Sequence, residues 1–447
     1  MAEVLGFDVD ALSEEKAAEV FSGNQLVEGS APLAMAYSGH QFGGFNPGLG
    51  DGRALLLGEV VGRDSKRYDI QLKGSGQTPY SRQGDGRAAL GPVLREYVMS
   101  EAMHALGIPT TRALAAVTTG DPVIREQMLP GAMVTRVASS HLRVGTFEFA
   151  AIQRDHDKLE ALTDFALARH YPVSNPELPK GLQLLEGVME AQAQLVARWM
   201  GVGFIHGVMN TDNCTISGET IDYGPCAFMD GYNPGQVYSS IDSQGRYAFA
   251  NQPPIAHWNM AILAQALLPM IDAEEEVAIK LAQEAVNGFQ AKFSKAYQAV
   301  MRDKLGLMSE QVGDGELARD FLVLMADDEA DFTGTFRALA DDDAIAAKLP
   351  SAAAWLVRWK ARLAMDGDVD PAARTSVMRG ANPAIIPRNH RMEAMITAGL
   401  EGDLAPFHAM VDAFSKPYED APVKGAMAAL ALPPQAEEVV HATFCGT

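Results

Sequence analysis

Cysteine is scarce in this sequence. Its 447 residues include three cysteines, Cys214, Cys226 and Cys445, and no two of them form a C-x-x-C pair. This number and spacing exclude a disulfide-built scaffold and a structural zinc site made of cysteines. Apolar residues make up 47% of the chain, so we expect it to fold on a hydrophobic core in a reducing compartment.

Basic residues are also in short supply. The chain has 36 Lys and Arg against 57 Asp and Glu, which gives a net charge of −21. Such a surplus of negative charge repels nucleic-acid phosphates. We therefore exclude a general DNA- or RNA-binding role and expect no nucleic-acid partner.

Uninterrupted apolar runs are missing as well. Polar residues and Pro269 interrupt the most apolar window, residues 255–271, which falls short of the ~18 apolar residues that suggest a membrane span. Residues 1–20 lack the basic start and the apolar stretch of a secretory signal. We expect a soluble, cytoplasmic and monomeric protein without a membrane partner.

The first part of the chain alternates between loops and strands. Two apolar runs, 54–61 and 68–73, are joined by a polar turn, which is typical of an antiparallel hairpin. Apolar residues at three- and four-residue spacing predict an amphipathic helix over 87–106. Two further strand-like runs follow at 113–118 and 132–137. This order indicates a small β-rich region with one helix.

After about residue 145 the pattern becomes helical. Helix-length patterns cover 182–200, 256–268 and 274–302. An irregular segment, 204–232, interrupts them and is expected to contain a small hairpin that turns at Ser217 and Gly218. The acidic segment 313–343 is interpreted as a solvated helical face.

A glycine-rich turn, GLGDGR at residues 48–53, precedes the first predicted strand. Gly50 and Gly52 let the backbone approach a bulky anion closely, and Arg53 adds a forked donor for phosphate oxygens. No Gly-Lys-Ser/Thr follows, so the turn is not a P-loop. A turn with a purely structural role is the alternative.

Lys73 ends the second predicted strand, and Glu96 lies in the middle of the next helix. Taken singly, two such residues are usually unrelated surface charges. Here they follow a glycine-rich hairpin in the order in which protein kinases hold nucleotide phosphates. This order predicts an ion pair in which Glu96 anchors a phosphate-binding lysine.

The segment HGVMNTDN at 206–213, followed by Asp222, resembles the catalytic loop and metal-binding segment of a kinase. In that alignment Val208 takes the place of the base aspartate and cannot accept a proton. Asn213 and Asp222 still offer two oxygen ligands of the kind that Mg²⁺ uses with phosphates. Asp212 is the best available proton acceptor. The alternative is a hairpin in which these side chains only satisfy turns.

The chain carries a joint resemblance to a known family in four segments, at residues 37–60, 69–121, 206–230 and 382–395. They are similar to the selenoprotein O family, also called YdiU, from about residue 30 to the C-terminus. With the kinase-like order of motifs, the resemblance implies an α+β, protein-kinase-like bilobal fold. We expect a small β-rich N-lobe at residues 1–145 and a large, mainly helical C-lobe at 146–447.

The resemblance also implies an activity. Such proteins bind ATP end for end relative to a kinase and transfer AMP to Ser, Thr or Tyr hydroxyls of proteins. Bacterial members are also linked to UMP transfer with Mn²⁺. The implied co-substrate is ATP or UTP, the implied metal is Mg²⁺ or Mn²⁺, and the implied partners are protein substrates.

By position, the resemblance implies a role for each matching residue. The implied nucleotide-binding residues are Gly50, Gly52, Arg53, Lys73, Asp85, Gly86, Arg136, Arg143 and Asp222. Asp212 would be the catalytic proton acceptor, and Asn213 with Asp222 would bind the metal. On spacing alone, Arg136 and Arg143 are interpreted as surface cations that share a helix face.

A redox bond is a further implication. Family members often carry selenocysteine or cysteine near the C-terminus, which can pair with a cysteine in the activation segment. Cys445 matches the first position, but Tyr238 occupies the second, which leaves Cys226 or Cys214 as the partner. A terminal thiol without a role is the alternative.

Two other functions are compatible with these motifs. A kinase-type phosphotransferase that uses Asp212 as a displaced base would produce ADP. A catalytically silent pseudokinase would bind nucleotide and act as a scaffold. We expect nucleotidyl transfer, with pyrophosphate as the leaving group.

Overall fold

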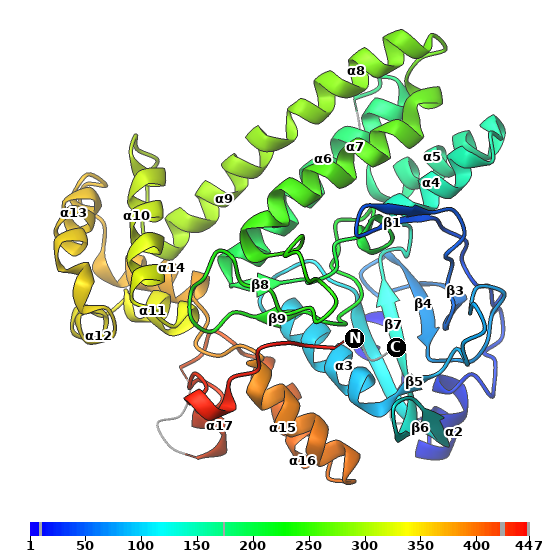
Figure 1. The fold of residues 1–447 in the computed structure, drawn as a ribbon, viewed down its shortest axis with the longest axis horizontal. Coiled ribbons are helices and arrows are strands. Elements are labelled where there is room, and N and C mark those ends of the chain that lie inside the picture. The colour runs from blue at the N-terminus through cyan, green and yellow to red at the C-terminus, as the bar shows by residue number, and fades with distance from the viewer. Residues whose placement is uncertain (9–10, 173–174, 421–424, 445–447) are drawn as a thin grey trace.

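The computed structural model describes residues 1–8, 11–172, 175–420 and 425–444. A small sheet-rich N-terminal region packs against a larger helical C-terminal region, and Figure 1 shows the first in blue and cyan and the second in green to red. This mixed α/β architecture confirms the fold class expected from the sequence and is compatible with a kinase-like bilobal fold.

The N-terminal region is built on one antiparallel sheet. Its strands are β3 (Ala54–Val61), β4 (Arg67–Lys73), β5 (Ala88–Ala89), β6 (Arg112–Ile124) and β7 (Met128–Ala138). They are ordered β3-β4-β7-β5, and β6 also pairs with β7. The predicted hairpin is therefore confirmed. The register sets Gln71 opposite Arg136, so the two side chains share one face of the sheet.

Four short elements precede this sheet: α1 (Ala2–Leu5), α2 (Glu14–Phe21), β1 (Gly39–Gln41) and β2 (Gly44–Asn46). β1 and β2 form a separate hairpin that turns at Phe42 and Gly43, both with positive φ. β1 contacts the short 3-10 helix η1 (Thr211–Asn213). This contact brings the early chain to the segment predicted to be catalytic.

Helix α3 (Leu90–Ala105) packs on the sheet through buried residues at helical spacing, among them Leu94, Val98 and Ala102. It begins at Leu90 instead of Arg87 because the preceding residues pair with β7 as strand β5. α3 also contacts α15 (Asn389–Leu400) and α16 (Ala405–Phe414). The helix that carries Glu96 is thus supported by both the sheet and the C-terminal helices.

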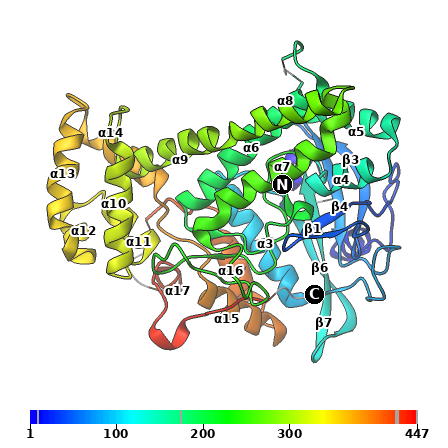
Figure 2. The same ribbon diagram turned by 45° about the horizontal axis from the view of Figure 1, so that its top comes forward.

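The C-terminal region is mainly helical (Figure 2). Its other helices are α4 (Val144–Ile152), α5 (His156–His170), α6 (Lys180–Gly201), α7 (Gln252–Ile271), α8 (Glu275–Asn287), α9 (Phe289–Leu305), α10 (Asp314–Asp327), α11 (Phe332–Ala338), α12 (Asp342–Lys348), α13 (Ala353–Ala364), α14 (Pro371–Ala381) and α17 (Ala426–Ala429). α6 contacts both α7 and α9. The single helix expected over 274–302 is divided into α8 and α9, which meet at Gly288.

The small hairpin expected around Ser217 and Gly218 is wrong. Thr215 and Thr220, on either side of the turn, bridge to Arg143 and Thr110 and not to each other. The Thr215 hydroxyl donates to the Glu219 carbonyl at 2.6 Å and accepts from the Glu219 amide at 2.9 Å. These side-chain bonds close the turn and leave the backbone free to pair with distant segments.

The strands of the irregular segment pair elsewhere. β8 (Phe204–Ile205) and β9 (Ala227–Phe228) form an antiparallel pair. It lies at the two ends of the loop that contains the predicted metal ligands. The pair therefore fixes where this loop leaves and rejoins the core.

The acidic segment is mostly a solvated face, as expected. Glu316, Asp327 and Glu329 are exposed, while Phe321 on α10 is buried in the core. Asp314 is the exception, because it is buried and accepts from Arg362 Nε at 2.6 Å.

One helix in the described part of the chain, Phe249–Ile271, is long and apolar enough to cross a membrane. Of its most apolar window, 56% is buried inside the protein. Burial of this kind is typical of a core helix. The cytoplasmic location stays a prediction.

Lys304 on α9 is a buried amine. Its Nζ donates to Asn382 Oδ1 at 2.8 Å and lies 4.0 Å from the centre of the Phe336 ring. Within the described residues, no carboxylate lies within 4.0 Å of this amine. Burial lowers the pKa of Lys304 to about 7.

Lys304 therefore makes stability depend on pH. In the unfolded chain its pKa is about 10.4, so around pH 8 to 9 the unfolded state holds about one more proton than the folded state, and at pH 7 about half a proton more. The unfolding free energy should rise with pH by about 1.4 kcal/mol per unit relative to Lys304→Met. Urea unfolding of both proteins at pH 7, 8 and 9 measures this difference. Parallel pH profiles would contradict the assignment of the slope to Lys304.

Candidate active site

The predicted site residues gather around one cavity of about 480 Å³. It is lined by Gly50, Gly52, Arg53, Lys73, Asp85, Gly86, Arg136, Arg143, Asp212, Asn213 and Asp222, together with other residues. We call it the site cavity. Glu96 lines a smaller neighbouring cavity that shares Arg53 and Lys73. A larger cavity of about 690 Å³ lies at α9 and α10 and contains none of the predicted residues.

Glycines are required where the turn at 48–53 meets the loop that carries Tyr80. Gly50 has a φ of 68°, and a Cβ there would lie 2.1 Å from the Tyr80 ring. A Cβ on Gly52 would lie 2.9 Å from the Tyr80 carbonyl oxygen. The Thr78 hydroxyl donates to the Asp51 carbonyl at 2.6 Å and fixes the same contact. The glycines thus have a packing role and also keep the backbone beside the cavity open.

Lys73 and Glu96 form the ion pair that the order of motifs predicts. Lys73 Nζ lies 2.5 Å from Glu96 Oε2 and 2.6 Å from Asp222 Oδ1. Burial alone would raise the pKa of Glu96, but the charges of Arg136 and Lys73 outweigh it and hold that pKa below its usual range. Glu96 is therefore a carboxylate, and Lys73 bridges the helix to the loop of Asp222.

Arg136 and Arg143 do not share a helix face, and both are buried. Arg136 lies on β7 and donates through Nε to Glu96 Oε1 at 2.9 Å. Arg143 precedes α4, and its guanidinium lies over the Tyr37 ring at 4.4 Å. The interpretation of these arginines as surface cations on one helix is wrong, because the strand and the loop after it direct both side chains inward.

Asp51 and Gln71 connect the two arginines, and sequence reasoning missed both. Gln71 accepts from Arg136 at 3.2 Å and donates through Nε2 to Asp51 Oδ2 at 3.0 Å. The other carboxylate oxygen of Asp51 accepts from Arg143 at 3.3 Å. Asp51 lies inside the GLGDGR turn, so its position in the motif was a usable signal. Gln71 offered no signal before the strand register was known.

Asp212 has the most exceptional environment in the site. It lies in η1, its Oδ1 is buried, and this oxygen has no hydrogen-bond partner within the described residues. Burial raises the pKa of Asp212 to about 6, although Arg143 opposes the shift. A poorly solvated carboxylate with one oxygen free of hydrogen bonds is well suited to accept a proton.

Asn213 and Asp222 both line the site cavity. Asn213 donates through Nδ2 to the Val208 carbonyl at 3.1 Å, which leaves its Oδ1 available. Asp222 has a φ of 66°, which is uncommon for aspartate. Burial would raise the pKa of Asp222, but Lys73, Arg136 and Arg53 outweigh burial and hold it well below the usual range. Asp222 is thus ionised over the whole physiological pH range.

The oxygen donors present fit a hard divalent cation. An amide oxygen and an ionised carboxylate are ligands that Mg²⁺ and Mn²⁺ accept, with phosphates and waters completing the shell. Across the described ranges, no group of three or more His, Cys, Asp or Glu side chains could hold a metal on its own. The donor set therefore fits a metal that arrives with a nucleotide better than one held by protein alone.

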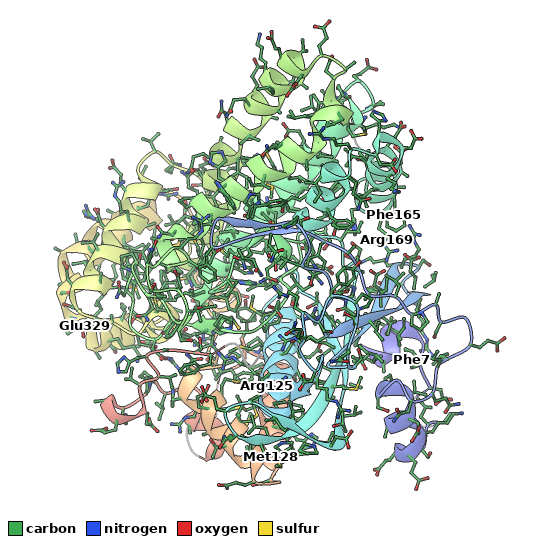
Figure 3. All side chains as sticks on the ribbon, turned by 45° about the vertical axis from the view of Figure 1, so that its right-hand side comes forward. Phe7, Arg125, Met128, Phe165, Arg169 and Glu329 are labelled. Atoms are coloured by element: carbon green, nitrogen blue, oxygen red, sulfur yellow. The ribbon has the colours of Figure 1, made fainter. Side chains whose placement is uncertain are left out.

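Further cations line the cavity that sequence reasoning did not assign. They are Arg82, Arg87 and Arg125. Arg125, which Figure 3 labels with Met128 near the end of the β6–β7 hairpin, forms a bidentate pair with Asp85 at 2.8 and 3.2 Å. This pair fixes the position of Asp85 in the lining of the site cavity. A Cβ on the next residue, Gly86, would lie 2.0 Å from the Gly76 carbonyl oxygen, so only glycine fits there.

The expected redox bond between Cys445 and Cys214 or Cys226 can be compared with the structure only at the last two cysteines. Cys445 lies outside the described residues. Cys214 and Cys226 are buried free thiols, and burial raises the pKa of each to about 12. Neither thiol is readily ionised at neutral pH, which disfavours exchange at these positions.

Comparison with known proteins gives a consistent result. A family model described as protein adenylyltransferase SelO matches residues 1–415. "Protein nucleotidyltransferase YdiU" of Rhizobium etli (strain CFN 42) is 56% identical over 100% of this chain and 91% of that protein. Proteins of the same name from Bradyrhizobium diazoefficiens (strain USDA 110) and Rhodopseudomonas palustris (strain BisB5) are 56% and 54% identical, over 100% of this chain and 92% of each relative.

The bridge of Asp51 and Gln71 can be tested by exchanging its two groups. Gln71→Glu sets a second buried carboxylate where the amide now donates at 3.0 Å, and we expect a loss of about 2–4 kcal/mol of unfolding free energy. Asp51→Asn combined with Gln71→Glu restores an amide beside a carboxylate and should recover about half of that loss. Urea unfolding of the single and double variants measures the coupling. Simple addition of the two single losses would contradict it.

Proposed function

The chain belongs to the protein adenylyltransferase SelO family and is a nucleotidyltransferase, and from this premise we propose that it transfers AMP from ATP to hydroxyls of proteins. The acceptors are Ser, Thr or Tyr side chains, and pyrophosphate is released. The observation that carries the proposal is the buried carboxylate of Asp212, whose Oδ1 has no hydrogen-bond partner among the described residues and which shares one cavity with two oxygen ligands and a set of cations.

In the proposed reaction, Asp212 accepts the proton of the acceptor hydroxyl. The hydroxyl oxygen forms a bond to the α-phosphorus of ATP, and the bond from that phosphorus to the bridging oxygen of the β-phosphate breaks. The electron pair leaves with pyrophosphate, which carries concentrated negative charge. Arg53, Lys73, Arg136 and Arg143 line the cavity and are suited to bind this charge.

Asn213 and Asp222 would hold Mg²⁺ or Mn²⁺. When bound, the metal neutralises phosphate charge and favours attack at phosphorus. Within this proposal Gly50, Gly52, Asp85 and Gly86 are further contacts for the nucleotide. UTP is a second possible nucleotide donor, and transfer of UMP from UTP is part of the same proposal.

Two features favour transfer of the nucleotidyl group over transfer of the terminal phosphate. Val208 is in the position of the kinase base and cannot act as one. Arg53, Lys73 and Arg136 belong to the sheet or to the residue just before it, whereas Asp212 and Asn213 belong to η1, and we take this division to favour a nucleotide with its phosphate tail at the sheet. We take residues 1–145 as the N-lobe that holds this tail, residues 146–447 as the C-lobe, and the monomer as the working unit.

Labelled ATP distinguishes this activity from kinase chemistry. With α-labelled ATP we expect label on protein, and with γ-labelled ATP we expect label only in pyrophosphate. Intact-mass analysis after incubation with ATP or UTP separately identifies AMP, UMP or phosphate by the added mass. Transfer of the γ-label to protein would reject nucleotidyl transfer in favour of a phosphotransferase.

Asp212→Asn tests the proposed proton acceptor. The amide keeps the shape of the side chain but cannot accept the proton, so kcat should fall by about 10²- to 10⁴-fold. Nucleotide affinity, measured by calorimetry, should change little in comparison. Asp412→Asn, at an exposed carboxylate on α16, is the matched control and should retain activity. Full activity of Asp212→Asn would show that another group takes the proton.

A further inference from the structure

Arg246 is a cation near the site cavity that the reaction described above does not use. Its guanidinium lies 4.9 Å from the centre of the Trp258 ring and 5.7 Å from the centre of the Tyr247 ring. The guanidinium carbon Cζ of Arg246 also lies 3.6 Å from the position that a Cβ on Gly43 would occupy. The side chain is therefore held between α7 and the β1–β2 turn.

This guanidinium has no acidic partner. Among the described residues, no carboxylate oxygen lies within 4.0 Å of it, and its Nε is buried without a hydrogen bond. The neighbouring Asp242 is already engaged, because its two oxygens accept from the backbone amides of Arg246 and Tyr247 at 2.9 and 2.8 Å. The Tyr247 side chain is a hydrogen-bond partner of this guanidinium. An arginine that is held by two aromatic rings and has no acidic partner is suited to bind a carboxylate.

The β1–β2 hairpin connects Arg246 to Asp212. At one end, a Cβ on Gly39 would lie 2.6 Å from Asp212 Oδ1. At the other end, Gly43 is beside Arg246. Gly39 begins β1 and Gly43 lies in the turn after it, so the two glycines are at most about 13 Å apart. That distance is the reach of two to four residues of an extended peptide.

The wall between the two groups belongs to the site cavity. Phe42, Asn210 and Ile241 line this cavity. The Phe42 amide and the Tyr247 hydroxyl both donate to Asn210 Oδ1, at 3.0 and 2.6 Å. The turn, the segment of Arg246 and the loop of Asp212 are thus joined at Asn210. Ile241 is 60% exposed and offers an apolar contact at the opening.

We propose that Arg246 is an anion-binding subsite for the acceptor, which binds an Asp or Glu side chain two to four residues from the modified hydroxyl. The inference rests on the proposed function, because it requires an acceptor hydroxyl at Asp212. It assigns the substrate class as proteins with an acidic residue close to the modified Ser, Thr or Tyr.

The negative charge of the whole chain does not attract acidic acceptors, so any preference for them has to come from a local contact. A net charge of −21 repels acidic acceptors at long range, and salt screens that repulsion beyond about 8–10 Å. At close range the acceptor meets the guanidinium of Arg246, which has no acidic partner among the described residues. Preference for an acidic residue is therefore expected to depend on its position in the peptide and not on total peptide charge.

A set of synthetic peptides tests the proposal. Each has a single Tyr or Ser in an alanine and glycine background, with Asp, Asn or Lys placed in turn at each of the four positions on either side. Transfer from α-labelled ATP gives kcat/KM for every peptide. We expect wild-type protein to prefer Asp over the isosteric Asn by about tenfold at one or two positions.

Charge reversal is the decisive variant. In Arg246→Gln the ratio of Asp to Asn peptides should fall to about one, and in Arg246→Glu the Lys peptide should become preferred at the same position. Arg246→Lys keeps the charge without the fork and should retain part of the preference. Arg319→Glu, at an exposed arginine on α10, changes the net charge equally and should leave the wild-type preference intact.

Several outcomes would overturn the proposal. These are equal use of Asp and Asn peptides by wild-type protein, an unchanged preference in Arg246→Glu, and labelling of whole proteins without labelling of any peptide. In each case α-label still reaches an acceptor, so the proposed function survives. Absence of α-label from every acceptor, including the enzyme itself, would reject the proposed function and this inference together.

Discussion

The site depends on one buried group of charges, formed by Lys73, Glu96, Arg136 and Asp222. Glu96 is shared by both cations, and Lys73 also reaches Asp222. Four elements meet here: α3, β4, β7 and the loop after β8. Buried charges are tolerated only when each has a partner at close range. The positions of the strands, the helix and the loop are therefore constrained together, which ties the metal-ligand side of the cavity to the phosphate side.

The order of motifs in the sequence predicted much of this arrangement. The contacts between side chains on neighbouring strands could not be predicted from that order. The hairpin, the helix of Glu96 and the Lys73–Glu96 pair come from local periodicity and from the sequence of motifs. The bridge through Asp51 and Gln71 needs the register of β4 against β7, which a single chain does not encode locally. The burial of Arg136 and Arg143 did not follow from their spacing of seven residues, because that spacing does not say which way a strand and the loop after it direct their side chains.

The wrong small hairpin shows a second limit. Around Ser217 the local signals for a turn were right, because Thr215 and Glu219 close one. The partners of the flanking residues are Arg143 and Thr110, far away in the chain. Strand pairing depends on tertiary contacts more than on local preference. The roles of the individual site residues, as distinct from their positions, stay predictions.

The carboxylates beside the cations have one more consequence. Lys73, Arg136 and Arg143 each hold an acidic side chain within 3.3 Å in the free protein. A nucleotide that enters does not meet bare positive charge, but exchanges places with partners already present. Its affinity is then the difference between two sets of ion pairs, and dissolved salt weakens both. Such a pocket should hold its ligand over a wider range of ionic strength than an open cationic groove would.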